Sequence, residues 1–264
     1  QRKARRPGWL FWTMIAAFAA LCVALASMTY TAGVTEASGL VKTTVFVTIV
    51  LGWLISLCLH EWAHAFVAYK SGDYSVLGRG YLTLDIRKYT DMVMSVLLPL
   101  GFLAMGGIPL PGGAVWINHG NIPSKHRQSA VSAAGPAMNI LFGLVLLMIV
   151  RTGVFDGVDA LRVALVFLAW LEFLTAAINL LPIPGLDGFG IIRPYLPYNI
   201  QVVAMQMATW AILLLFLVMI QTNAFSFLAD ISTDALAAAG GSLFDAEYGQ
   251  RLFRSFSFLG NNGV

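Results

Sequence analysis

The chain has 264 residues, of which 58% are hydrophobic and only 11% charged, and its mean hydropathy is +0.77. This composition is typical of a polytopic membrane protein and excludes a large soluble domain. The formal net charge of +3 is small, and much of the positive charge lies in the first six residues, which indicates membrane topology and not a nucleic-acid surface. Cys22 and Cys58 both lie in apolar runs, so neither a disulfide framework nor a thiolate metal site is indicated.

The first predicted element is a transmembrane helix from Trp9 to about Tyr30, long enough for one crossing. The basic run before it also resembles the start of a signal peptide, but no cleavage site is apparent. We therefore expect residues 1–42 to form an N-terminal transmembrane helix and an outer loop. The basic end is expected to stay in the cytoplasm.

A second predicted span, about 43–69, carries two histidines and a glutamate in a segment that is otherwise apolar. On a helix, His60 and His64 leave the same face and can share a metal ion, and Glu61 lies next to them. Two imidazole ligands with an adjacent general base form the zinc-hydrolase pattern. Because ionisable groups inside a membrane are costly unless they are paired or bound to metal, we expect this cluster to be functional. A pair of satisfied core histidines is the competing interpretation.

The residues after this span form two further segments, each with a different composition. Short runs rich in β-forming residues surround a Gly-Arg-Gly break and predict a small membrane-associated β-hairpin over 73–90, kept in the cytoplasm by its basic residues. The next apolar run, 92–115, is nominally long enough to span, but its three prolines and five glycines break a continuous helix.

The predicted span at about 127–151 has a surface of small residues suited to close helix packing, and it carries one amide side chain, Asn139. An amide buried in lipid without a partner would be costly. We therefore expect Asn139 to lie near the site and, together with Asn179, to bind a substrate backbone or a developing oxyanion.

The span at about 158–182 ends in a stretch that can supply a third metal ligand. Pro182 and Pro184 release the backbone from the helix, and Asp187 follows on a turn loosened by Gly188, so its carboxylate can reach back towards the histidines. Two histidines and one carboxylate would leave a fourth zinc position for water. Taken alone, the stretch is equally well explained as an ordinary helix end.

These ligands constrain the topology. His60, His64 and Asp187 must meet at one depth, so an even number of crossings must separate them. The spans 127–151 and 158–182 already supply two, and 92–115 is therefore expected to be a re-entrant loop. The positive charges of Lys125, Arg127 and Arg193 then lie in the cytoplasm, as the positive-inside rule favours.

A last apolar run, about 202–222, is expected to cross outward. The remaining tail mixes acidic and basic residues with Phe and Leu, and it is either an interfacial amphipathic segment or a partner-binding tail. Residues 201–264 would thus form a C-terminal transmembrane helix and an amphipathic tail. The tail leaves open a homo-oligomer or a partner subunit.

Three motifs, in this order along the chain, resemble the signature elements of the site-2 protease family of intramembrane zinc metalloproteases. They are His60-Glu-Trp-Ala-His64, the segment from Gly135-Pro136 to Asn139, and the loop from Asn179 to Gly188. The resemblance covers about residues 43–190. The glycine- and proline-rich stretch 107–116 is similar to a loop in a bacterial branch of the family. There is no room for the PDZ domain that some members insert between catalytic spans.

The resemblance implies an all-α polytopic membrane protein whose metalloprotease core, 43–200, has three catalytic helices. The fold would have about five transmembrane helices, the re-entrant loop and the β-hairpin. One Zn²⁺ ion would be held by His60, His64 and Asp187, with Glu61 as general base. The implied reaction is hydrolysis of peptide bonds within or near transmembrane segments of membrane proteins. The substrate is expected as an extended strand beside the 73–90 hairpin.

The expected location is the bacterial plasma membrane, with the active-site opening on the cytoplasmic side and no nucleic-acid partner. The alternative is a non-proteolytic membrane scaffold or partner subunit that retains the zinc site. A metal transporter is disfavoured because its ligands would be spaced along a pathway, whereas these form one compact cluster. His119 and His126 are expected to be solvated loop residues, and Arg193 to anchor a helix end.

Overall fold

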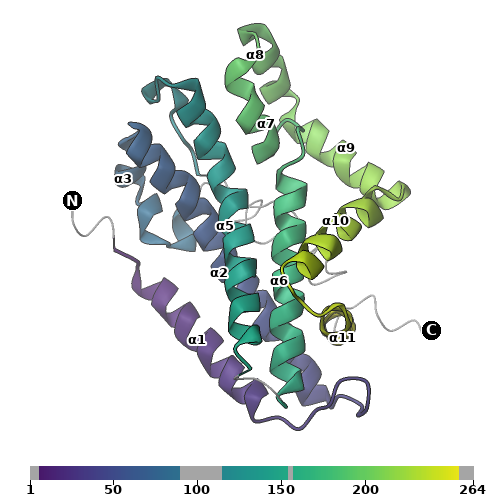
Figure 1. Ribbon diagram of the computed structural model, residues 1–264. Coiled ribbons are helices and arrows are strands. Elements are labelled where there is room, and N and C mark those ends of the chain that lie inside the picture. Colours follow the sequence, from purple (N-terminus) through teal and green to yellow (C-terminus); the bar gives the residue numbers. More distant parts are fainter. Residues whose placement is uncertain (1–5, 90–114, 154–156, 256–264) are drawn as a thin grey trace.

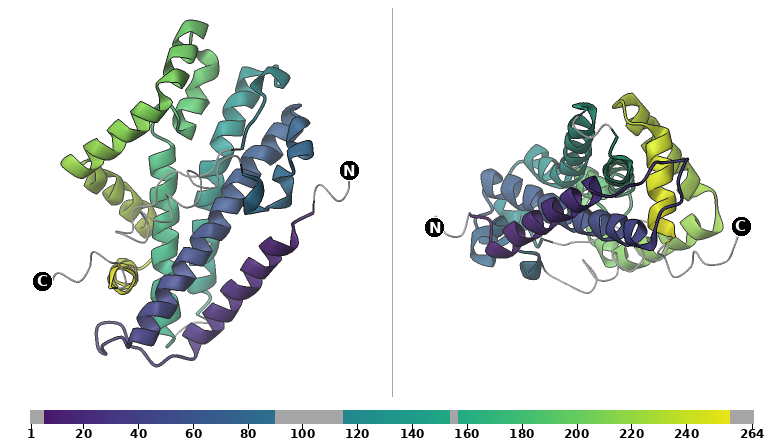
Figure 2. Two further views of the ribbon diagram at one scale, coloured as in Figure 1. Left: turned by 180° about the vertical axis from the view of Figure 1, so that it is seen from behind. Right: turned by 90° about the horizontal axis from the view of Figure 1, so that it is seen from below.

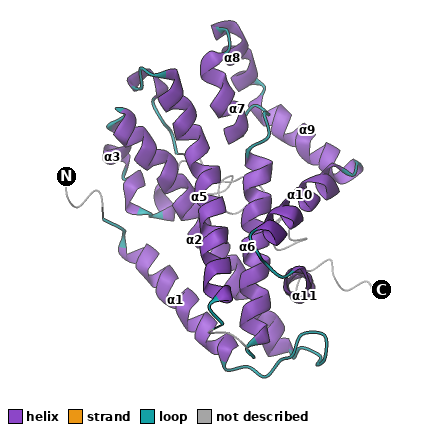
Figure 3. Cartoon of the chain, in the orientation of Figure 1, coloured by secondary structure: helices purple, strands orange, loops and turns teal. Residues whose placement is uncertain are grey.

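The computed structural model describes residues 6–89, 115–153 and 157–255, and all regular secondary structure in these ranges is helical (Figures 1 and 3). Within these ranges, four helices are long and apolar enough to cross a membrane, or up to five if a bent pair near the C-terminus is one span. These four are α1 (Trp9–Ala26), α2 (Gly39–Ser71), α5 (Lys125–Arg151) and α6 (Asp159–Asn179). The expectation of an all-α polytopic membrane protein is confirmed at this level.

Local sequence signals set the ends of the two helices that frame the site. α2 begins where the Ser38 hydroxyl accepts a hydrogen bond from the Val41 N–H, and it ends at Gly72, whose φ of 120° suits glycine. α5 begins in the same way, because Ser124 accepts from the Arg127 N–H. With 33 residues, α2 is on the order of 50 Å long, which exceeds the hydrocarbon thickness of a bilayer.

The three helices α2, α5 and α6 pack side by side, with α5 antiparallel to both others (Figure 1). α6 lies at the centre of the bundle. In its 18-residue apolar stretch, 89% is buried within the protein, against 17% for the corresponding stretch of α1. In both side views α1 lies along one flank of this bundle, and the C-terminal helices lie on the other (Figures 1 and 2). The side chains of α6 therefore form most of the core between α2 and the C-terminal helices.

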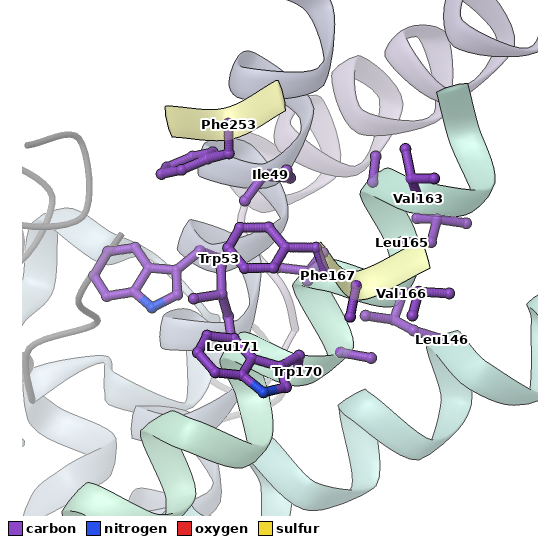
Figure 4. Close-up of a cluster of buried hydrophobic side chains, with 14 of the residues drawn as sticks. Ile49, Trp53, Leu146, Val163, Leu165, Val166, Phe167, Trp170, Leu171 and Phe253 are labelled. Carbon is purple, nitrogen blue, oxygen red and sulfur yellow. The ribbon is translucent and has the colours of Figure 1, made fainter. Parts of the chain in front are cut away.

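The C-terminal residues fold back onto the bundle. α10 (Ala224–Ala238) and α11 (Leu243–Arg254) both pack against α6. Phe253 of α11 is fully buried and its ring lies 4.9 Å from that of Phe46 and 5.7 Å from that of Phe167 (Figure 4). Arg162 of α6 pairs with Asp245 of α11 at 3.2 Å. Part of the predicted tail is therefore core, and its relation to lipid or to a partner stays a prediction.

The last apolar run is not one straight helix. α8 (Tyr198–Gln206) and α9 (Ala208–Gln221) meet at Met207 with a bend of 62°. No proline or glycine lies at this break, and nothing in the local sequence explains it. The span expected over 202–222 is thus replaced by a bent pair.

The β-hairpin expected over 73–90 is not confirmed. The described residues of that stretch form helical turns: α3 (Ser75–Arg79), η2 (Tyr81–Thr83) and η3 (Ile86–Lys88). Two aspartates account for this difference, because Asp73 accepts from the Ser75 N–H and Asp85 from the Arg87 N–H. Such local bonds satisfy the backbone without a strand partner, so β-propensity does not decide the structure.

The expected re-entrant loop, 92–115, lies almost entirely outside the described residues, but the segments on either side of it are informative. The N–H of Asn118, before α5, donates to Asp73, just after α2, at 2.8 Å. The chain therefore leaves α2 and enters α5 at the same end of the bundle. The start of α1 is at this end too, because the Gly8 N–H donates to the Thr83 carbonyl at 2.7 Å.

Candidate metal centre

The structure brings His60, His64 and Asp187 together, although Asp187 is more than 120 residues away in the sequence. The Nε2 atom of His60 lies 3.2 Å from Asp187 Oδ2, and that of His64 lies 3.2 Å from Asp187 Oδ1. The two Nε2 atoms are 3.0 Å apart. In the part of the chain that the structure describes, this is the one group of three such side chains close enough to hold a metal ion.

A tight turn after α6 delivers the carboxylate. The N–H of Ile183 donates to the Leu181 carbonyl and that of Leu186 to the Ile183 carbonyl, and Gly185 takes a φ of 98°. Asp187 then begins the short helix α7 (Asp187–Ile192). Gly188 lets α7 lie against the end of α6, because a Cβ there would collide with the Leu180 and Leu181 carbonyls.

The outer nitrogens of both imidazoles fix which nitrogen faces the centre. His64 Nδ1 lies 2.7 Å from the Val131 carbonyl oxygen, and His60 Nδ1 lies 2.5 Å from Asn139 Oδ1. A carbonyl oxygen only accepts, so each Nδ1 donates, and in the neutral imidazole each Nε2 then keeps its lone pair. Two nitrogen lone pairs and a carboxylate thus point at one place. These groups repel one another unless a cation lies between them. Two imidazoles and one carboxylate are also a donor set that zinc takes.

Gly135 of α5 makes room for this cluster. A Cβ at this position would collide with the Nε2 atoms of His60 and His64. The small residues predicted to allow close helix packing therefore serve a more specific purpose at this position: the backbone of α5 forms one wall of the candidate metal centre.

Glu61 is buried beside the two histidines and is only 2% exposed. Its Oε2 accepts a hydrogen bond from the Val115 N–H at 3.0 Å. Val115 is the first described residue after 90–114 and belongs to the segment that the bond between Asn118 and Asp73 ties to α2. The backbone before α5 thus holds the carboxylate of Glu61 in place.

The two predicted amides are both buried, and they differ in what the structure shows around them. Asn139 is 2% exposed, and its Nδ2 donates to Glu172 at 2.7 Å and to Ser56 at 3.1 Å. Both of its amide protons are thus used within the protein, and the predicted contact of Asn139 with a substrate stays a prediction. Asn179 is 5% exposed and is the last residue of α6.

Sequence reasoning missed Glu172, a fully buried carboxylate in the middle of α6. The signal was present, because Glu172 is an acidic residue inside an apolar span, where such residues are costly. Ser56 of α2 also donates to its Oε2. The hydrogen-bonded network around His60 therefore connects three helices, α2, α5 and α6.

His119 and His126 lie apart from the candidate metal centre. His126 Nδ1 is 2.8 Å from the Tyr195 hydroxyl, and both residues are exposed. Burial and then the nearby Arg193 guanidinium lower the pKa of His119 to about 4, so its imidazole is neutral at pH 7. Arg193 itself is half-buried after α7, and its Nη1 lies 3.8 Å from the sulfur of Met205 on α8.

Comparison with known proteins gives several relatives. The chain is 43% identical over 209 residues to "Putative zinc metalloprotease Rip2" of Mycobacterium tuberculosis, covering 75% of this chain and 80% of the relative. It is 40% identical to the protein of the same name from Mycolicibacterium smegmatis, over 67% of this chain and 68% of the relative. It is 31% identical to "Putative zinc metalloprotease YwhC" of Bacillus subtilis, over 58% of this chain and 71% of the relative. No family model and no solved structure matches.

Proposed function

Since the chain belongs to the site-2 protease family of intramembrane zinc metalloproteases, we propose that His60, His64 and Asp187 hold its zinc ion and that Glu61 is the general base. The observation that carries this assignment is the convergence of two Nε2 lone pairs and a carboxylate within 4.8 Å. α2, α5 and α6 are then the three catalytic helices, within a core of about residues 43–200.

A zinc ion held by these three side chains would supply a Lewis acid that makes water a stronger nucleophile near neutral pH. Glu61 takes a proton from the water that attacks the scissile carbonyl carbon, and it later gives this proton to the leaving amine nitrogen as the C–N bond breaks. The Val115 N–H, 3.0 Å from Oε2, keeps the carboxylate aimed during both transfers.

The substrate is a transmembrane segment of a membrane protein, which must unwind locally because a helix hides its carbonyls in hydrogen bonds. The site is submerged: His60 lies eleven residues before the end of α2 at Ser71, or on the order of 15 Å at 1.5 Å per residue. We assign Asn179 to the binding of the exposed substrate backbone, because it ends the helix that delivers Asp187.

The active-site opening and the N-terminus face the cytoplasm of a bacterium in this proposal. Seven basic residues lie in or next to the segments at the end of the bundle that contains the end of α2, the start of α1 and the start of α5: Lys70, Arg79, Arg87, Lys88, Lys125, Arg127 and Arg193. An excess of Lys and Arg marks the cytoplasmic side of a membrane protein.

Replacing Glu61 with Gln tests the assignment. The purified variant is expected to keep one zinc ion per chain, because Glu61 is not a ligand, and to lose cleavage of membrane-protein substrates reconstituted with it in liposomes. Mass spectrometry of the fragments measures cleavage. The matched control is Glu247→Gln on the exposed face of α11, which is expected to cleave like the wild type.

Two outcomes would count against this proposal. A zinc-replete Glu61→Gln protein with normal turnover would remove Glu61 from the reaction. A wild-type protein that binds zinc and yields no fragment from any membrane protein would favour the scaffold alternative.

A further inference from the structure

A buried hydrogen-bonded chain leads from the candidate metal ligand His60 to a carboxylate on another helix. His60 Nδ1 on α2 lies 2.5 Å from Asn139 Oδ1 on α5, and Asn139 Nδ2 lies 2.7 Å from Glu172 Oε2 on α6. Ser56, one turn before His60, donates to the same Glu172 oxygen. Among the described residues no hydrogen bond joins Glu172 to His60 directly, and the link between them runs through Asn139.

The surroundings of Glu172 are unfavourable for a residue that only fills space. The residue is 0% exposed, and its Oε1 has no hydrogen-bond partner among the described residues. Its neighbours along α6, Leu171 and Phe173, belong to the hydrophobic core. Burying a carboxyl group at this depth is costly, whereas a leucine would pack there without that cost. This cost points to a functional reason for the carboxylate.

The orientation of the Asn139 amide provides that reason. Glu172 Oε2 accepts hydrogen bonds from both Asn139 Nδ2 and Ser56, so it holds Asn139 with the NH₂ group towards Glu172 and the oxygen towards His60. If the amide turned over, its oxygen would face the carboxylate and its NH₂ group would donate to His60 Nδ1. The proton of His60 would then move to Nε2, the atom that faces Asp187, and the lone pair needed for a metal would be lost.

We propose that Glu172 is a positioning residue that fixes the orientation of the Asn139 amide and thereby holds His60 in the tautomer that binds zinc. The inference rests on the proposed zinc site. In many metal sites a carboxylate accepts directly from the outer nitrogen of a ligating histidine; here an amide on α5 separates the two groups.

The decisive variant is Glu172→Gln, which has nearly the same shape but can either accept from Asn139 or donate to it. The amide of Asn139 is then free to turn over. Zinc affinity of the purified protein, measured by competition with a chromophoric chelator, is expected to fall about tenfold, the lower end of the effect of outer partners on metal sites. Thr175→Val, a buried polar change one turn further along α6, is the matched control and is expected to keep the wild-type affinity.

A second variant separates positioning from a structural role. In the double variant Glu172→Gln with Asn139→Asp, the new carboxylate on α5 accepts from His60 Nδ1 directly and from the new amide on α6, so the tautomer is fixed again. Zinc affinity is expected to return towards the wild-type value, and the absorption spectrum of the cobalt-substituted protein is expected to match that of the wild type. Rescue of this kind does not follow if Glu172 only joins helices together.

The inference is overturned if Glu172→Gln binds zinc as tightly as the wild type, or if the double variant binds no better than Glu172→Gln. These results differ from a failure of the proposed zinc site itself. In that case the wild-type protein would bind no zinc in the same assay.

Discussion

Gly135 is the residue whose replacement acts most directly on the candidate metal centre without removing a ligand. Its Cα faces the two imidazole rings, and an added Cβ would collide with Nε2 of both His60 and His64. Neither ring can give way freely, since His60 is held by Asn139 and His64 by the Val131 carbonyl. One methyl group here therefore displaces the two Nε2 atoms that we propose bind metal.

We expect Gly135→Ala to lose zinc binding and proteolysis, although alanine is the better helix former. Gly39→Ala is the control, because it also adds a methyl group to a long helix and a Cβ at Gly39 meets no atom within 4 Å. Zinc content after gel filtration and fragment analysis measure the two effects. Normal zinc content in Gly135→Ala would contradict the geometry described for the site.

The sequence is a good guide to residues whose chemistry conflicts with their surroundings. His60, Glu61, His64 and Asp187 could be singled out because ionisable residues in or beside apolar spans require a reason. The contacts between helices could not be predicted in the same way. Helical spacing within α6 does not reveal that Glu172 faces Asn139, and nothing in the sequence gives the orientation of the Asn139 amide.

At the scale of elements, α11 is the least expected part of the core. It lies across α6 and also contacts α2 (Figure 1). Gly249 allows the close approach, because a Cβ there would collide with the Val163 carbonyl oxygen. The ring of Phe253 then packs against those of Phe46 and Phe167. α11 therefore stabilises the two helices that carry the histidines and Glu172.

Phe253→Ala is expected to destabilise the protein by about 3 to 5 kcal/mol, the usual cost of emptying a buried phenylalanine site. Phe244→Ala on the same helix removes a ring that is 49% exposed and should cost about 1 kcal/mol or less. Thermal unfolding in detergent compares the two. Equal effects of both variants would mean that α11 does not pack as described.

The turns after α2 show why element type is harder to predict than element position. A boundary after residue 71 and a break at Gly78 to Gly80 were both predictable from glycine and charged residues. Strand was expected because β-forming residues flank this break. The side chains of Asp73 and Asp85 accept hydrogen bonds from backbone N–H groups in the helical turns that follow them, and such short-range bonds outweigh a weak propensity.

At the scale of the whole molecule, the antiparallel order of α2, α5 and α6 fixes which of the described loops share a side of the membrane. The end of α2 and the start of α5 lie at one end of the bundle, tied by the bond between Asn118 and Asp73. The loop between α1 and α2 lies at the opposite end (Figure 2). The argument from ligand depth predicted this arrangement, whereas the re-entrant loop over 92–115 stays a prediction.

Single cysteines test the orientation in a background in which Cys22 and Cys58 are replaced. Glu36→Cys, exposed between α1 and α2, is expected to react with a membrane-impermeant maleimide on intact bacterial cells. Lys125→Cys, exposed at the start of α5, is expected to react only in inverted vesicles. The reverse pattern would place the active-site opening outside the cell.

The central claim is that this protein hydrolyses peptide bonds within the membrane and uses a zinc ion held by His60, His64 and Asp187. The most direct measurement is cleavage of a transmembrane substrate in proteoliposomes after the zinc is removed with a chelator and then restored. The account predicts that cleavage stops, that zinc restores it in the wild-type protein, and that zinc fails to restore it in Asp187→Ala. Cleavage that persists in zinc-free protein, or that zinc restores fully in Asp187→Ala, would contradict it.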